Sequence, residues 1–208
     1  MLFDPQNLMT ALWTQRPVFH SQVDFRGAFE QSLHELHPNL EIPQDLSFEG
    51  KSPDIKLVAN GSVFAIELRY FVRKLNATVN GERFELSNQG ARDQRGYDLI
   101  KDVEWLEKLA KHYSQITGIA ILLSNDPVYW NEPRKRNTIY EDFRLTEGRL
   151  LNGSLKWGLN ASEGSFKGRK TTLNIKGKYR LHWRNYSFIP NDKYGWFRYL
   201  MINVSQGV

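Results

Sequence analysis

The chain has 208 residues, of which 40% are hydrophobic and 25% are charged, a composition that favours one globular domain spanning residues 1–208. No apolar stretch approaches about 18 residues, and the N-terminus lacks the basic start and apolar run of a signal peptide. We therefore expect a cytoplasmic protein with no membrane partner. Because the chain has no cysteine, disulfides, thiolate zinc sites and a cysteine nucleophile are excluded.

Positive charge is concentrated in the last third of the chain. Residues 1–130 hold 13 Lys/Arg and 17 Asp/Glu, whereas residues 131–208 hold 15 and 6. A basic segment of this kind predicts a polyanionic partner. A solvated basic surface is the alternative that charge alone leaves open.

The first secondary structure that the pattern predicts is a helix followed by a β-hairpin. The helix should begin at Ser21, a good N-cap residue, and end near His37, before a proline. Two strands should cover residues 54–59 and 62–72. They are joined by Asn60-Gly61, the type of dipeptide most indicative of a tight hairpin.

A long helix over residues 91–113 and an apolar strand over residues 118–123 should follow the hairpin. With the strand 62–72 they form a βαβ unit, which predicts parallel strands and a right-handed crossover. From about residue 140 the chain is strand-like and punctuated by glycine, and we expect it to extend the same sheet. The predicted fold is α/β, leaning to α+β: a mixed β-sheet flanked by helices.

Two acidic residues mark the predicted hairpin. With Asn60-Gly61 as the loop, Asp54 faces Glu67, and both side chains point to the same side as those of Lys56 and Arg69. The opposite face would be apolar and would carry Ile55, Leu57, Phe64, Ile66 and Leu68. Opposed carboxylates repel unless a cation lies between them, and without His or Cys they select Mg²⁺ or Mn²⁺. Alternatively, Lys56 and Arg69 neutralise the acids in a surface ion-pair cluster.

The hairpin resembles the signature of the PD-(D/E)XK nuclease superfamily. The residues that carry this resemblance are Ser52-Pro53-Asp54-Ile55 and Ala65-Ile66-Glu67-Leu68-Arg69. Gln89, with Tyr97 beyond it, is similar to the glutamine and tyrosine of RecB-like members. The resemblance implies a restriction-endonuclease-like core over about residues 21–126 with a basic, β-rich extension over about 140–208. It also implies a metal-dependent nuclease, with the acid pair as metal ligands and Gln89 as an orienting residue.

The chain departs from this signature at the lysine position, which is occupied by Arg69. Arginine can contact a phosphate but does not act as a base, so Lys56 or Lys101 would have to supply the ammonium. If neither lysine reaches the metal, the protein would bind nucleic acid without cutting it. A third metal ligand would come from the preceding helix, as Glu35 rather than Glu30, although both also fit solvated helix charges.

Basic residues in the last third are candidate nucleic-acid contacts. One strand is expected to present Lys178, Arg180 and Arg184 on one face, at a spacing close to that of phosphates along a strand. The loop run Arg134-Lys135-Arg136 is a second candidate. DNA is the expected partner ahead of RNA, with a homodimer possible. A solvated edge strand, or a basic face that binds an acidic protein, is the alternative.

Overall fold

The computed structural model describes residues 3–43, 46–59 and 61–204. Its helices are α1 (Pro5–Gln15), α2 (Gln22–Leu36), α3 (Arg92–His112), the 3-10 helix η1 (Glu141–Phe143) and α4 (Glu163–Phe166). Its strands are β1 (Ile55–Ala59), β2 (Ser62–Phe71), β3 (Leu75–Val79), β4 (Glu82–Leu86), β5 (Ile116–Ser124), β6 (Leu150–Leu155), β7 (Leu173–Arg180), β8 (Trp183–Phe188) and β9 (Trp196–Val204).

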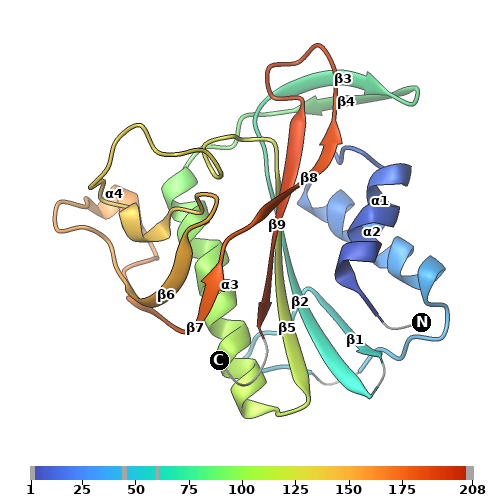
Figure 1. Cartoon of the computed structure of the whole chain (residues 1–208), viewed down its shortest axis with the longest axis horizontal. Coiled ribbons are helices and arrows are strands. Elements are labelled where there is room, and N and C mark those ends of the chain that lie inside the picture. The colour runs from blue at the N-terminus through green and yellow to red at the C-terminus, as the bar shows by residue number, and fades with distance from the viewer. Residues whose placement is uncertain (1–2, 44–45, 60, 205–208) are drawn as a thin grey trace.

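Five strands form a central mixed sheet in the order β1-β2-β5-β9-β8 (Figure 1). β2 and β5 are parallel, with α3 as the connection between them, and the other neighbours are antiparallel. The predicted βαβ unit and the predicted fold class, a mixed sheet with helices, are therefore confirmed.

The β1–β2 hairpin has the predicted register. Ile55 pairs with Ile66 and Ala59 with Ser62, so the two strands close around Gly61, which has a φ of 73°. Asn60, the other residue of the predicted loop, lies outside the described residues. Because the register holds, alternate residues of β2 point to opposite faces of the sheet, and Glu67 points away from the apolar face that contains Ile66.

Helices cover the two faces of the sheet in different ways (Figure 1). On one face, α1 and α2 pack against the side chains of a first apolar cluster, which includes Leu57 and Leu68. On the other, α3 packs with the β6–β7 sheet over a second cluster, which includes Leu106 and Leu122. β5 is buried except at Thr117, because it lies between β2 and β9 and is covered on both faces.

The helix that precedes the hairpin begins where the sequence predicts. The hydroxyl of Ser21 accepts a hydrogen bond of 3.1 Å from the backbone N–H of Asp24, which caps α2. α1 was not expected from the sequence. It is capped by Asp4, whose carboxylate accepts a 2.8 Å bond from the N–H of Gln6, with Pro5 in its first turn.

The C-terminal third corrects one expectation. A single strand was expected to carry Lys178, Arg180 and Arg184, but β7 ends at Arg180 and β8 begins at Trp183. β7 pairs with β6 in a separate two-stranded sheet, whereas β8 pairs with β9 in the central sheet. The chain leaves β7 at Leu181, whose N–H and C=O bond to Arg149 and Gly148 instead of to a neighbouring strand. The expected extension of the main sheet is therefore right for β8 and β9 and wrong for β6 and β7.

A second hairpin, β3–β4, was not assigned from the sequence. Its loop is Asn80-Gly81, and both residues have positive φ, 51° and 82°, as the turn of a tight hairpin requires. Among the described residues, no helix is long and apolar enough to span a membrane.

Candidate active site

Glu67 is a buried carboxylate between the sheet and α3. It lies on β2 opposite Ala120 of β5, and only 1% of its surface is exposed. Burial raises the pKa of Glu67 to about 7, and the negative charge of Asp102 acts in the same direction. The charge of Lys51 opposes the shift. A carboxylate in this environment is poised to lose or share a proton near neutral pH.

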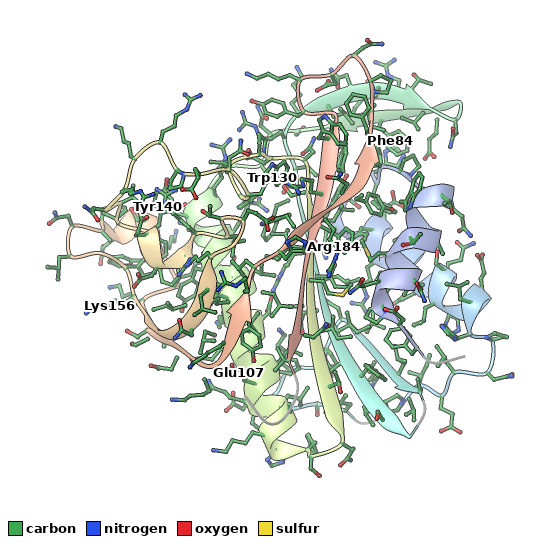
Figure 2. All side chains as sticks on the ribbon, viewed as in Figure 1. Phe84, Glu107, Trp130, Tyr140, Lys156 and Arg184 are labelled. Atoms are coloured by element: carbon green, nitrogen blue, oxygen red, sulfur yellow. The ribbon has the colours of Figure 1, made fainter. Side chains whose placement is uncertain are left out.

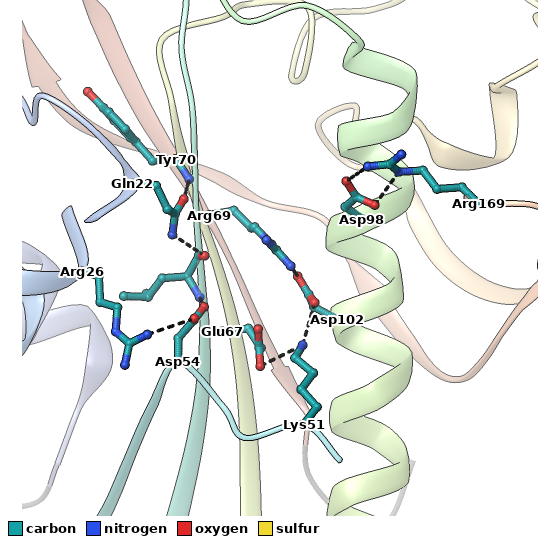
Figure 3. A network of polar contacts seen from close by, with 11 residues as sticks. Gln22, Arg26, Lys51, Asp54, Glu67, Arg69, Tyr70, Asp98, Asp102 and Arg169 are labelled. Atoms are coloured by element: carbon teal, nitrogen blue, oxygen red, sulfur yellow. Dashed lines mark hydrogen bonds and ion pairs between the residues drawn. The ribbon is translucent and has the colours of Figure 1, made fainter. Parts of the chain in front are cut away.

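Lys51 is the cation nearest to Glu67 (Figure 3). Its Nζ lies 3.0 Å from Oε1 of Glu67, 3.0 Å from Oδ1 of Asp102 and 4.5 Å from the ring of Trp105. A tight turn holds it there, because the backbone groups of Phe48 and Lys51 bond reciprocally at 2.9 and 3.1 Å. Oε1 nevertheless accepts no well-aligned hydrogen bond, so the contact with Lys51 is a pairing of charges.

Arg69 does not contact Glu67 but bonds to Asp102 of α3. Its Nε and one terminal nitrogen both lie 2.6 Å from Oδ2 of Asp102, which is 4% exposed. Burial acts to lower the pKa of Arg69, but the bonds to Asp102 outweigh it and raise that pKa above its ordinary value. Arg69 is therefore a permanent cation at this site and not a base.

Asp54 immediately precedes β1, and its side chain lies beside β2. Its Oδ2 accepts a 2.9 Å hydrogen bond from the N–H of Leu68, and its Oδ1 lies 3.5 Å from a guanidinium nitrogen of Arg26 on α2. The negative charge of Asp54 contributes to the raised pKa of Glu67, so the two carboxylates interact. The sequence placed Asp54 on the face of Glu67. In the structure its carboxylate lies between that face and the face covered by α2.

The structure also places four other predicted residues. Gln89 bonds to the backbone of Val72, with its N–H and its side-chain oxygen at 3.0 and 3.2 Å, and so secures the end of β2. Lys101 is exposed on α3. Glu35 accepts hydrogen bonds from the side-chain amides of Gln15 on α1 and Gln31 on α2. Lys56 lies on β1 opposite Ala65.

The predicted nucleic-acid contacts are dispersed over the C-terminal third. Arg134, Lys135 and Arg136 are exposed in the loop between β5 and η1. Lys178 and Arg180 are exposed on β7, whereas Arg184 is half-buried on β8. Lys178, Arg180 and Arg184 therefore do not form the single cationic ladder that one strand would have provided.

Sequence reasoning missed Lys51 and Asp102. Lys51 directly precedes the Ser52-Pro53-Asp54 run, and Asp102 follows Lys101 on α3, so both were adjacent to residues that had been singled out. Neither has a fixed spacing from Glu67, because their proximity depends on the turn at residues 48–51 and on the packing of α3. Only the three-dimensional structure brings them together.

The cluster can be tested for its fit to a divalent cation. Glu67 carries a buried oxygen without a hydrogen bond, and Asp54 and Asp102 lie close enough to act on its pKa. Within the described ranges, no three His, Asp or Glu side chains are arranged around one point as a metal site. Asp54 and Glu67 are the two carboxylates that a hydrated Mg²⁺ would use here, and they are paired with Arg26 and Lys51 respectively. Lys51 would have to leave Oε1 for such an ion to bind.

Comparisons with known proteins add no relative on which to base an assignment. No protein-family model, no curated protein and no solved structure matches the chain. Membership of a family is therefore not shown, and the function has to be argued from the geometry of the Glu67 cluster and from the fold that holds it.

Proposed function

We propose that the protein is a metal-dependent nuclease that hydrolyses phosphodiester bonds in nucleic acid, with Mg²⁺ or Mn²⁺ held by Asp54 and Glu67. The observation that carries the proposal is the buried oxygen of Glu67 that accepts no hydrogen bond, beside a second carboxylate. Burying a carboxylate costs folding free energy. The charge of Lys51 offsets part of this cost, and a divalent cation would offset more of it. The resemblance to PD-(D/E)XK nucleases and the order of the elements support the same reading.

The bound metal would activate water and neutralise charge on the phosphate. The protein would supply two further cations. Arg69 is oriented by Asp102 and would face the phosphate as a permanent charge. Lys51 takes the place of the ammonium that the sequence sought in Lys56 or Lys101, because its Nζ already lies beside Glu67 and Asp102. Unlike arginine, lysine can also give up a proton.

The substrate class is inferred from charge. The last third of the chain carries 15 Lys/Arg and 6 Asp/Glu, which favours binding to a polyanion. DNA is the first substrate to test, followed by RNA. We place the activity in the cytoplasm, where a chain without cysteines has no disulfides to form.

Nucleic-acid binding without cleavage is a second candidate function. It is favoured by the charge balance of the cluster, in which Arg26, Lys51 and Arg69 lie within ion-pair distance of Asp54, Glu67 and Asp102. Such a network needs no metal ion to neutralise its acids. A protein that had lost cleavage would retain the fold and the basic surface.

Cleavage of labelled DNA and RNA in the presence of Mn²⁺ separates the two functions. We expect the wild type to cut and Asp54→Asn and Glu67→Gln to lose at least a hundredfold in rate, because each loses a metal ligand. Asp98→Asn is the matched control, since Asp98 of α3 is likewise an acid paired with a cation, Arg169 at 2.7 Å, but lies outside the cluster. A wild type that binds but never cuts would replace the nuclease by the binding protein.

A further inference from the structure

A hollow lies where β5 ends and β9 begins. Its volume is about 420 Å³, within the range of sites for small organic ligands. Its lining residues are Asn125, Pro127, Trp130, Asn185, Lys193, Tyr194, Trp196 and Arg198. The lining combines aromatic rings, cations and amides, and it includes no acidic side chain. Figure 2 labels Trp130, which forms one wall beside β9.

Backbone hydrogen bonds within the loop between β8 and β9 hold its conformation, so one side of the hollow is formed before any ligand binds. The N–H of Ile189 donates to the C=O of Gly195 at 2.9 Å, and the N–H of Gly195 donates to Asp192 at 3.1 Å. A side chain at Gly195 would overlap the carbonyl of Ile189. The N–H of Tyr194 is held by the carboxylate of Asp192 at 2.8 Å. The ring of Tyr194 is thereby presented to the hollow without a large ordering cost.

Cations and aromatic rings alternate around the hollow. The guanidinium of Arg198 lies 5.6 Å from the ring centre of Trp130, and Nζ of Lys193 lies 5.3 Å from that of Tyr194. Trp196 packs against Phe188 with ring centres 4.5 Å apart and ring planes tilted by 35°, yet 53% of its surface stays exposed. An exposed indole beside two cations is the arrangement that proteins use to stack bases and to bind their phosphates.

The hollow lies on the same face of the sheet as Glu67. Arg198 pairs with Ser124 of β5, and Ser124 pairs with Phe71 of β2. Phe71 is an even number of residues after Glu67, so the two side chains point to the same face. Four residues of strand and two strand spacings give a separation of about 16 Å. A strand of a few nucleotides could therefore reach from the hollow to the Glu67 cluster.

We propose that this hollow binds one unpaired nucleotide of a single-stranded nucleic acid, with its base stacked on Trp196 and its phosphate facing Lys193 and Arg198. The exposed amide of Asn185 offers both a donor and an acceptor to the base edge. An acidic peptide would satisfy the cations but not the exposed indole. The proposal rests on the proposed function only in taking nucleic acid as the ligand, and it names the form of the substrate as single-stranded.

The test is the binding of a short, fluorescein-labelled oligothymidylate, measured by anisotropy in EDTA so that no cleavage occurs. We expect Trp196→Ala to weaken binding about tenfold, which corresponds to ~1.4 kcal/mol, the scale of one stacked base. Lys193→Ala should weaken binding less at high salt than at low salt. Trp13→Ala is the matched control, because Trp13 is a 45% exposed tryptophan on α1, and Lys111→Ala is the control for Lys193.

Three results would overturn the proposal: no binding by the wild type, equal binding by Trp196→Ala and Trp13→Ala, or tighter binding of a duplex of the same sequence. Titration with thymidine monophosphate distinguishes a free nucleotide from a unit of a strand, and equal affinity would identify the free nucleotide as the ligand. Binding in EDTA does not depend on catalysis. A protein that binds in this way but never cuts would therefore fail the nuclease proposal and support this one.

Discussion

The ammonium of Lys51 lies 3.0 Å from Oε1 of Glu67. The cation that pairs with this buried acid therefore comes from the turn before β1 and not from the neighbouring strand position, where Arg69 turns instead to Asp102. Lys51 is 39% exposed, so its side chain has a path to solvent, whereas Glu67 has almost none. This asymmetry allows Lys51 to move away from Glu67 while the carboxylate stays in place.

Loss of Lys51 should destabilise the protein more where Glu67 is ionised, because the substitution then removes the pairing with Glu67 as well as that with Asp102. In Lys51→Met, we expect the free energy of unfolding at pH 8 to fall by about 1–2 kcal/mol, because a buried carboxylate loses its cation while solvent screens part of the effect. At pH 5, where Glu67 is protonated, the loss should be smaller, because it comes mainly from the contact with Asp102. Urea denaturation at the two pH values measures the difference. Lys101→Met, at an exposed lysine of α3, is the control and should show no pH-dependent loss.

The raised pKa of Glu67 predicts how stability depends on pH in the metal-free protein. Glu67 titrates near 4.5 when unfolded and near 7 when folded. Between these values the folded state holds a proton that the unfolded state has lost, so stability should fall as pH rises from 4.5 to 7. The contribution of this group amounts to about 3 kcal/mol. Glu67→Gln cannot titrate, and its stability curve should lack this fall. Parallel curves for the two proteins would contradict the assignment.

The sequence predicted the strands and the helix that hold the site better than it predicted the side-chain contacts within the site. The β1–β2 register followed from Asn60-Gly61, and the parallel β5 followed from the long helix between two strands. Both signals are local and periodic. Lys51 and Asp102 could not be predicted, because their contact with Glu67 depends on how an irregular turn and a helix pack against the sheet.

The C-terminal third was less predictable for a related reason. Tyr179, Leu181 and Trp183 alternate with charged residues as one strand would, but their side chains are buried in a corner where the chain passes from one sheet to another. A period of two cannot distinguish a continuous strand from two strands joined at Leu181. The carbonyl and N–H of Leu181 bond across this corner to residues that are distant in sequence.

Substitution of Arg69 should show whether its positive charge contributes to cleavage. Arg69→Lys should preserve or raise the cleavage rate, because it keeps the positive charge and restores the residue of the family signature. Arg69→Ala should raise the barrier by about 2–4 kcal/mol, as loss of a transition-state donor does. Single-turnover cleavage with Mn²⁺ measures both. If Arg69→Ala cut as fast as the wild type, Arg69 would have only a structural role at Asp102.

Two helical glycines give a test of the packing of α3. Gly96 faces η1, and a methyl group there would overlap the carbonyl of Phe143, whereas Gly27 of α2 has open space around it. Alanine favours a helix over glycine by about 1 kcal/mol. Gly27→Ala should therefore raise the free energy of unfolding by up to about that amount. Gly96→Ala should lower the free energy of unfolding, although alanine brings the same gain in helix propensity there. Thermal unfolding of both variants provides the comparison. Equal stabilisation by the two substitutions would show that α3 does not contact η1 this closely.

A crystal soaked in Mn²⁺ would show whether Asp54 and Glu67 hold a metal, because the anomalous scattering of manganese locates the ion without reference to activity. We expect one anomalous peak between the carboxylates of Asp54 and Glu67, with oxygen ligands at roughly 2.0–2.3 Å and with Nζ of Lys51 displaced from Oε1 of Glu67. The same soak of Glu67→Gln crystals should lose the peak. A wild-type crystal at pH 8 with no peak at this position, and with Lys51 still 3.0 Å from Glu67, would contradict this expectation.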